Sequence, residues 1–147
     1  MHRLPLVLSG VMFACLSTAL PEEPEQGVQW IVSPKDAMHA VEVQQRPMLI
    51  YLTGEQCVWC RKLERSTLSD ESITATIQQR FVPLKVDGAK HADLMKNLQV
   101  RGLPAMLVVA PDGSVLHRIV GYVEPDELSE ALNSSLLRHK ASKPRLK

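Results

Sequence analysis

Three observations predict a single α/β domain whose mixed central sheet is flanked by helices. Short apolar runs alternate with amphipathic stretches from residue 28 to about residue 98, which predicts a parallel half built from βαβ units. Two further apolar runs, 105–110 and 115–120, are separated by a short turn and predict an antiparallel C-terminal hairpin. The chain has 147 residues, 45% of them hydrophobic, which suits one compact domain with short tails.

The first predicted elements form a strand, a helix and a second strand. Residues 28–32 are predicted to be a short strand. Ser33 and Pro34 then supply an N-cap and a proline at the first helical position, so we expect a helix from there to about residue 45. Pro47 prevents the helix from continuing, and the apolar run 48–52 is typical of a strand buried on both faces.

The middle of the chain continues the alternation. After a turn at residues 53–56, a helix is expected to begin at Cys57 and to pause near Ser69. It resumes because residues 69–71 place a cap and acidic groups at a new helix N-terminus. A strand is predicted at 81–86, followed by a short helix with two leucines four residues apart.

The last third has a different pattern. The runs 105–110 and 115–120 are joined by Pro111-Asp112-Gly113, residues that favour a tight turn, and together they predict the hairpin. Gly121 ends the second strand. A final amphipathic helix is expected to start near Pro125, and its apolar face consists of Leu128, Ala131, Leu132 and Leu136.

The first 19 residues are expected to be a secretory signal peptide. Arg3 precedes an uncharged apolar run, and small side chains at Ser17 and Ala19 fit cleavage after Ala19. A retained membrane anchor is an alternative, because the run lies at the short limit for spanning a bilayer. Lipid attachment at Cys15 is a third alternative. The protein is therefore predicted to be exported by a bacterium, to the periplasm or as a secreted protein.

The remaining sequence divides into three parts. Residues 20–27 are an acidic, proline-rich lead that we expect to be poorly ordered, residues 28–138 are the folded domain, and residues 139–147 are a basic tail. The formal net charge is +1, so no overall field favours binding to nucleic acid or to a membrane surface. A monomer is expected.

The motif Cys57-Val58-Trp59-Cys60 carries the predicted chemistry. Loss of the signal peptide leaves two cysteines three residues apart, and in an oxidising compartment such a pair is expected to be redox-active. Free N–H groups and a partial positive charge at a helix N-terminus stabilise a thiolate. Cys57 is therefore the predicted nucleophile, and Cys60, one turn further in, is the predicted resolving thiol.

Two other uses of a close cysteine pair are disfavoured. A structural zinc site needs four ligands, and the sequence has no second cysteine pair and no histidines with ligand spacing. Covalent haem attachment needs a histidine directly after the second cysteine, where this chain has Arg61. No metal and no other cofactor is expected.

With these features in order, the chain resembles the thioredoxin superfamily, in particular exported bacterial thioredoxin-like reductases. The resemblance spans residues 30–137. It rests on an apolar strand before the cysteine helix, Val86-Asp87 at the end of the next strand, Gly102-Leu103-Pro104 before the hairpin, and Val120-Gly121 before the last helix.

The resemblance implies further site residues. Pro104 should be the cis-proline of the family and should face the two cysteines, which leaves the Leu103 backbone free to pair with an extended substrate segment. Trp59 is similar to the tryptophan of the CxWC variants of the superfamily. It is expected to shape the substrate groove or shield the sulfurs, with simple packing over the helix as the alternative.

The chain also departs from the family in three places. Gln56 stands where the family usually has tryptophan, Tyr51 where thioredoxin has a buried carboxylate, and Pro83 where thioredoxin has a neighbouring lysine. A tyrosine cannot accept a proton near neutral pH as a carboxylate does. Proton transfer from Cys60 is therefore expected to use water or another side chain such as Glu55, or to be slower.

The sequence thus predicts an enzyme, a thiol–disulfide oxidoreductase that acts on exported proteins and is favoured as a reductase. Its partners would be disulfide-containing or dithiol proteins and an upstream electron donor. The compact length leaves no room for the inserted helical domain of a dedicated oxidase or the dimerisation domain of an isomerase. Two alternatives are a thioredoxin-like protein of cytochrome maturation and a thioredoxin-fold binding module with vestigial cysteines.

Overall fold

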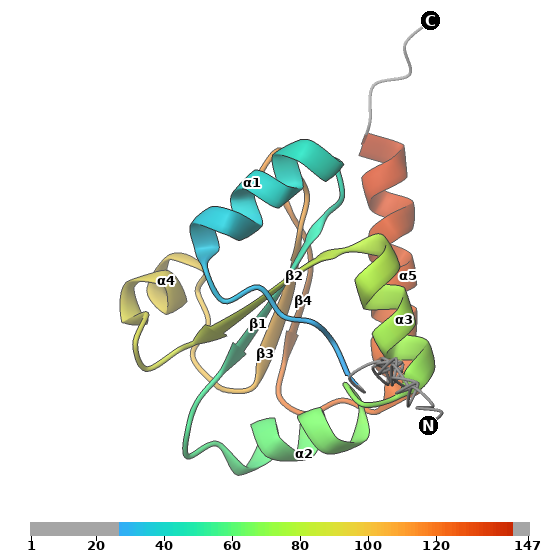
Figure 1. The fold of residues 1–147 in the computed structure, drawn as a ribbon. Helices are drawn as coiled ribbons and strands as arrows, with labels where there is room; N and C mark the ends of the chain where they lie inside the picture. Colours follow the sequence, from blue (N-terminus) through green and yellow to red (C-terminus); the bar gives the residue numbers. More distant parts are fainter. Residues whose placement is uncertain (1–26, 143–147) are drawn as a thin grey trace, which may run out of the picture.

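A four-stranded mixed sheet forms the centre of the computed structural model, which describes residues 27–142 (Figure 1). The strand order is β2-β1-β3-β4; β1 and β2 are parallel, and the other two pairs are antiparallel. The predicted mixed α/β fold is therefore confirmed. The strands are β1 (Met48–Thr53), β2 (Val82–Asp87), β3 (Ala105–Val109) and β4 (Val115–Val120), and the helices are α1 (Pro34–Gln44), α2 (Val58–Ser66), α3 (Glu71–Arg80), α4 (Ala92–Asn97) and α5 (Pro125–Ser142).

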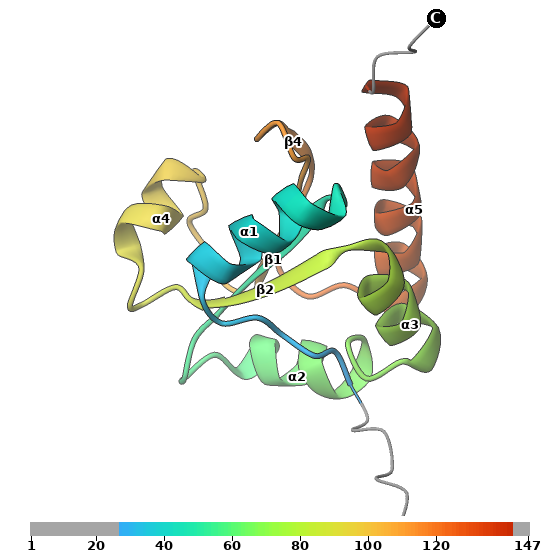
Figure 2. The same ribbon diagram turned by 45° about the horizontal axis from the view of Figure 1, so that its top comes forward.

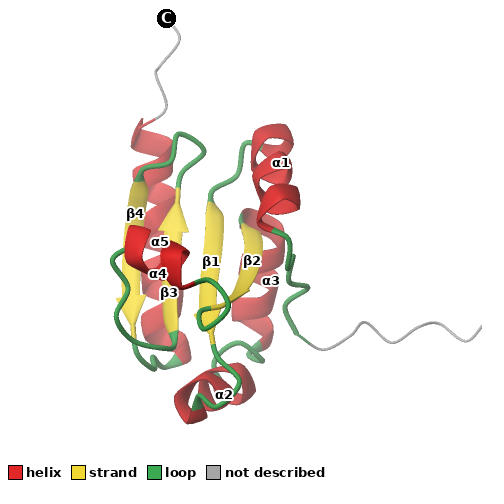
Figure 3. Ribbon diagram, turned by 90° about the vertical axis from the view of Figure 1, so that its left-hand side faces the viewer, coloured by secondary structure: helices red, strands yellow, loops and turns green. Residues whose placement is uncertain are grey.

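Helices cover both faces of the sheet. Figure 1 shows α1 and α4 on one side of the strands and α3 and α5 on the other, and Figure 3 shows α2 lying across the end of the sheet. The central strand β1 is buried on both faces, as its apolar sequence predicts. Leu49 and Tyr51 point into the core beneath α3 and α5, while Ile50 and Leu52 point into the core beneath α1.

The predicted caps and turn are present. The Ser33 side chain accepts a hydrogen bond from the N–H of Asp36 (3.3 Å) at the start of α1. The Asp70 carboxylate accepts from the N–H groups of Ser72 and Ile73 at the start of α3. In the hairpin turn Gly113 has a φ of +85°, a backbone conformation that glycine adopts without steric cost.

The predicted strand at residues 28–32 is wrong. Only one parallel bridge forms there, between Ile31 and Leu84, as the segment runs along the edge of β2 (Figure 2). The N–H of Ile31 donates to the carbonyl of Pro83, and the N–H of Lys85 donates to the carbonyl of Ile31, both at 2.9 Å. The next hydrogen bond of such a ladder would come from the N–H of residue 83, and proline has none. In the other direction Ser33 already caps α1.

The chain ends lie partly outside the described residues. Helix α5 continues to Ser142, four residues into the segment predicted as a basic tail, and His139 is buried. The predicted signal peptide, most of the acidic lead and residues 143–147 fall outside the described part of the chain. Among residues 27–142, no helix is both long enough and apolar enough to cross a membrane.

Candidate active site

Cys57 and Cys60 form a disulfide at the start of α2. The two sulfurs are 2.10 Å apart and the two Cα atoms 5.2 Å apart. Cys57 is the N-cap of the helix, and its sulfur accepts a hydrogen bond from the N–H of Cys60 at 3.1 Å. A helix N-terminus that donates to this sulfur favours the negative charge of a thiolate there. Cys57 is half-buried and Cys60 is 1% exposed, so only Cys57 is open to a partner.

The loop at Leu103 and Pro104 approaches Gly54, which lies shortly before Cys57. The Leu103–Pro104 peptide bond is cis, the configuration that the family resemblance implies. The Pro104 carbonyl accepts a hydrogen bond from the N–H of Gly121 at 2.8 Å. A Cβ at Gly54 would lie 3.2 Å from the Leu103 side chain and 3.9 Å from Cys57 Cβ. Leu103 and Cys57 therefore both lie next to Gly54, and a glycine permits the close approach of the Leu103 side chain.

Trp59 lies on the surface of α2, between the two cysteines in the sequence. It is 55% exposed, and its ring is tilted against that of Tyr122, with 5.9 Å between the ring centroids. The Lys62 ammonium lies 5.3 Å from the Trp59 centroid and 4.1 Å from the Tyr122 centroid. Tyr122 was not among the predicted site residues, although its position directly after Val120-Gly121 was a usable signal.

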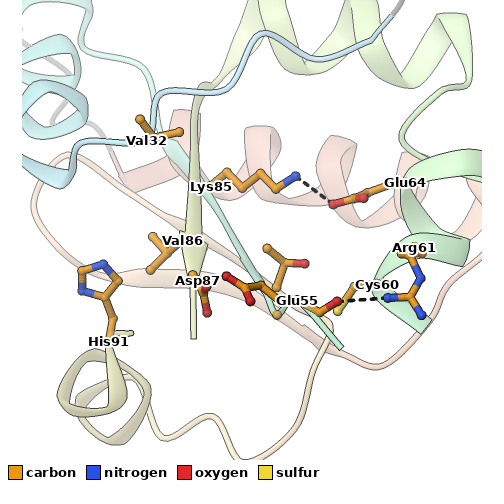
Figure 4. Close-up of a pocket in the computed structure, with 11 residues that line it drawn as sticks. Val32, Glu55, Cys60, Arg61, Glu64, Lys85, Val86, Asp87 and His91 are labelled. Atoms are coloured by element: carbon orange, nitrogen blue, oxygen red, sulfur yellow. Dashed lines mark hydrogen bonds and ion pairs between the residues drawn. The ribbon is translucent and has the colours of Figure 1, made fainter. Parts of the chain in front are cut away.

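A pocket of about 460 Å³ opens next to Cys60 (Figure 4). Cys60 lines it, together with residues from the ends of β1 and β2, from α2 and from the loop before α4. Its charged lining residues are Glu55, Arg61, Glu64, Lys85 and Asp87.

A buried tyrosine, Tyr51, contacts two residues that line this pocket, Cys60 and Glu64. The Tyr51 hydroxyl lies 3.2 Å from Glu64 Oε1, 3.2 Å from Thr53 Oγ1 and 3.4 Å from the carbonyl of Cys60. Burial, and then the charge of Glu64, raise the pKa of Tyr51 well above its ordinary value. Tyr51 therefore keeps its proton and acts as a hydrogen-bond donor, in agreement with the expectation that it cannot serve as a base.

Glu64 and Lys85 are the functional candidates that sequence reasoning missed. Lys85 Nζ lies 2.8 Å from Glu64 Oε1, and each side chain is about one-third exposed. In the β1–β2 register Lys85 pairs with Tyr51, whereas Pro83 pairs with Leu49. Counting along the sequence placed Pro83 where thioredoxin has its lysine. In this structure the lysine that pairs with Tyr51 is Lys85, two residues further on. Glu64 carried a local signal, because residues four apart share a helix face and Glu64 follows Cys60 at that spacing.

Glu55, the side chain named as an alternative proton acceptor, is engaged elsewhere. Its side chain is 78% exposed and lies 3.0 Å from Lys90 Nζ, which also lies 3.4 Å from Asp87. The hydrogen bonds with Glu55 and then with Asp87 raise the pKa of Lys90. The Arg61 side chain donates to the Glu55 carbonyl at 3.0 Å, so the loop before Cys57 is tied to both α2 and the loop after β2.

These features define the class of protein. Residues 34–135 match the family model of the thioredoxin-like domain, and the chain belongs to that family. Within residues 27–142, no group of three or more metal-ligating side chains is close enough to hold a metal ion.

Particular relatives carry the same domain. The chain is 24% identical over 99 residues to the thiol:disulfide interchange protein DsbD of Yersinia pestis (strain Pestoides F); the match covers 64% of this chain and 17% of that protein. The chain thus spans about a sixth of the length of this curated relative. A thioredoxin from Thermus thermophilus superimposes with a TM-score of 0.72 at 20% identity, covering 78% of this chain and 92% of that one. The oxidised C-terminal domain of Neisseria meningitidis DsbD gives a TM-score of 0.63 at 20% identity, with 72% and 98% covered.

Proposed function

We propose that this protein is a thiol–disulfide oxidoreductase that reduces disulfides in exported proteins. The observation that carries the proposal is the disulfide at the N-terminus of α2, with a half-buried Cys57 and a buried Cys60. The homology to thiol:disulfide interchange proteins supports the same reaction.

The reaction needs only these two cysteines and a partner disulfide. In the reduced protein the Cys57 thiolate attacks one sulfur of the partner, which forms a mixed disulfide and releases the other partner sulfur as a thiolate. Cys60 then loses its proton and attacks Cys57 Sγ. The Cys57–Cys60 disulfide forms, the second partner thiolate leaves, and two electrons have passed to the partner.

The surface around Cys57 is the proposed binding site for the partner. The backbone of Leu103 would pair with an extended segment of the partner, next to Pro104. The exposed Trp59 and its neighbour Tyr122 would contact side chains that flank the partner cysteine. The signal-like sequence of the first 19 residues supports a location in the periplasm or outside the cell.

Reduction of insulin by dithiothreitol tests the activity. Wild type is expected to accelerate the reaction, and Cys57→Ser is expected to abolish the acceleration while the fold is retained. A wild type without activity would instead favour a binding module with vestigial cysteines. The direction of transfer follows from the reduction potential: a value of about −270 mV supports a reductase, and one of about −120 mV contradicts it.

A further inference from the structure

We propose that Glu64 accepts the proton of Cys60 during resolution, and that Tyr51 and Lys85 position its carboxylate for this step. The inference rests on the proposed function and names the group that carries out its proton transfer. The proposed carboxylate lies on α2, one turn after Cys60. In thioredoxin the corresponding carboxylate lies on the strand before the cysteine helix, at the position of Tyr51.

Resolution poses a specific problem in this chain. The Cys60 thiol must lose a proton before it can attack, yet Cys60 is 1% exposed and burial disfavours a thiolate. Tyr51 occupies the position beneath it on β1, and its pKa is raised, so it cannot accept that proton. Another base must lie within reach of Cys60.

The position of Glu64 meets this requirement. It follows Cys60 by four residues on α2, so both side chains lie on one face of the helix, and both line the same pocket (Figure 4). The Tyr51 hydroxyl lies between the two residues, at 3.4 Å from the backbone carbonyl of Cys60 and 3.2 Å from Glu64 Oε1. Glu55 and Asp87 also line the pocket, but both carboxylates pair with Lys90, and neither shares the Tyr51 hydroxyl with Cys60.

The hydrogen bonds leave one carboxylate oxygen available. Tyr51 and Lys85 both donate to Glu64 Oε1, and no hydrogen bond from the described residues reaches Oε2. Two donors on one oxygen restrict the rotation of the carboxylate. The pocket is open and, at about 460 Å³, large enough to admit water that can bridge Cys60 and Oε2.

Proton transfer to Glu64 precedes the attack of Cys60 on the mixed disulfide. The Cys60 S–H proton passes to the Glu64 carboxylate, directly or through a water, and the Cys60 thiolate attacks Cys57 Sγ. The bond between Cys57 and the partner sulfur breaks, and the partner leaves as a thiolate. Glu64 then returns its proton to that thiolate or to solvent, which restores the carboxylate.

Reaction of the reduced protein with an equimolar amount of 5,5′-dithiobis(2-nitrobenzoate) separates the two steps. Attack by Cys57 releases one coloured thiolate, and attack by Cys60 releases the second in an intramolecular phase. Stopped-flow absorbance gives both rates as a function of pH. The Cys60→Ser variant identifies the first phase, because it can release only the thiolate that comes from attack by Cys57.

Glu64→Gln is expected to slow only the second phase, and to do so in a pH-dependent way. At about pH 6.5 the rate of the second phase should fall about tenfold to 100-fold. This range reflects the size of general-base catalysis, reduced by the reaction in which water accepts the Cys60 proton without Glu64. As the pH rises the two rates should approach each other, because hydroxide removes the Cys60 proton increasingly well without the carboxylate. Lys85→Gln and Tyr51→Phe keep the carboxylate and should show the same pattern more weakly.

Glu55→Gln is the matched control, because it removes another carboxylate of the same pocket; both of its phases should follow wild type. Equal second phases in Glu64→Gln and wild type at every pH would overturn the inference. So would a loss of the same factor at every pH, which indicates a displaced Cys60 rather than a missing base. A wild type that releases no thiolate contradicts the proposed function itself.

Discussion

The two sulfurs of the active-site disulfide face different surroundings. Cys57 is half-buried next to Gly54, which the Leu103 side chain also approaches, and the exposed Trp59 follows two residues later. Cys60 is buried against Tyr51 and borders the pocket that holds the Glu64–Lys85 ion pair. We propose contact with a partner on the first side and control of a proton on the second. Variants on the two sides should separate these tasks.

The largest contrast should come from the cysteines themselves. Cys57→Ser removes the proposed nucleophile, so neither turnover nor a covalent adduct is expected. Cys60→Ser leaves the nucleophile but cannot resolve, so a mixed disulfide with the partner protein should accumulate. Non-reducing gel electrophoresis and mass spectrometry detect the adduct. An adduct with Cys57→Ser and none with Cys60→Ser would reverse the two roles.

Truncation of the aromatic pair should weaken partner binding without affecting proton transfer. Trp59→Ala and Tyr122→Ala are each expected to raise the KM for a protein substrate about tenfold, since partly exposed aromatic contacts at interfaces contribute about 1–2 kcal/mol. Both phases with the small aromatic disulfide should stay within about twofold of wild type, because that substrate lacks the flanking segments. Exposed Val43, on α1, serves as the control: Val43→Ala should leave the KM unchanged.

On the buried side, Tyr51→Phe should show a cost in stability. The variant keeps the ring that fills the core and contacts Trp30, and loses only the hydroxyl with its hydrogen bonds to Thr53 and Glu64. The free energy of unfolding is expected to fall by about 1 kcal/mol, the usual net value of a buried hydrogen bond. Urea titration of wild type and variant, both oxidised, measures it. An unchanged midpoint would mean that the hydroxyl contributes nothing to folding.

The smallest effect on the site is expected from Asp70→Ala, a change remote from both sides. The hydrogen bond from the Ser72 side chain and that from the Ile73 backbone lower the pKa of Asp70. A carboxyl whose pKa is lowered on folding stabilises the fold above its unfolded pKa and loses this contribution as the pH falls. The Tm difference between wild type and variant should therefore be largest at neutral pH and narrow below about pH 4. Neither kinetic phase should change; a pH-dependent change in the second phase would undermine the assignment to Glu64.

Much of the fold could be predicted because its signals are local. The N-caps Ser33 and Asp70 act within three residues of their partners, and the turn before Ser114 needs only Asp112 and Gly113. The strand at 28–32 was predicted wrongly because its pairing depends on β2, where Pro83 interrupts the ladder. That partner lies more than fifty residues away in the sequence.

The sequence by itself determined the reactive pair, because Cys57 and Cys60 are three residues apart in one helical turn and need no distant partner. It also placed a proline at position 104, before the hairpin. Only the tertiary structure decided what surrounds Cys60. The contacts of Glu64 with Tyr51 and Lys85 join residues 13 and 21 positions apart. They depend on the register of β1 against β2 and on the packing of α2 at the end of the sheet, which arise only when the whole core assembles.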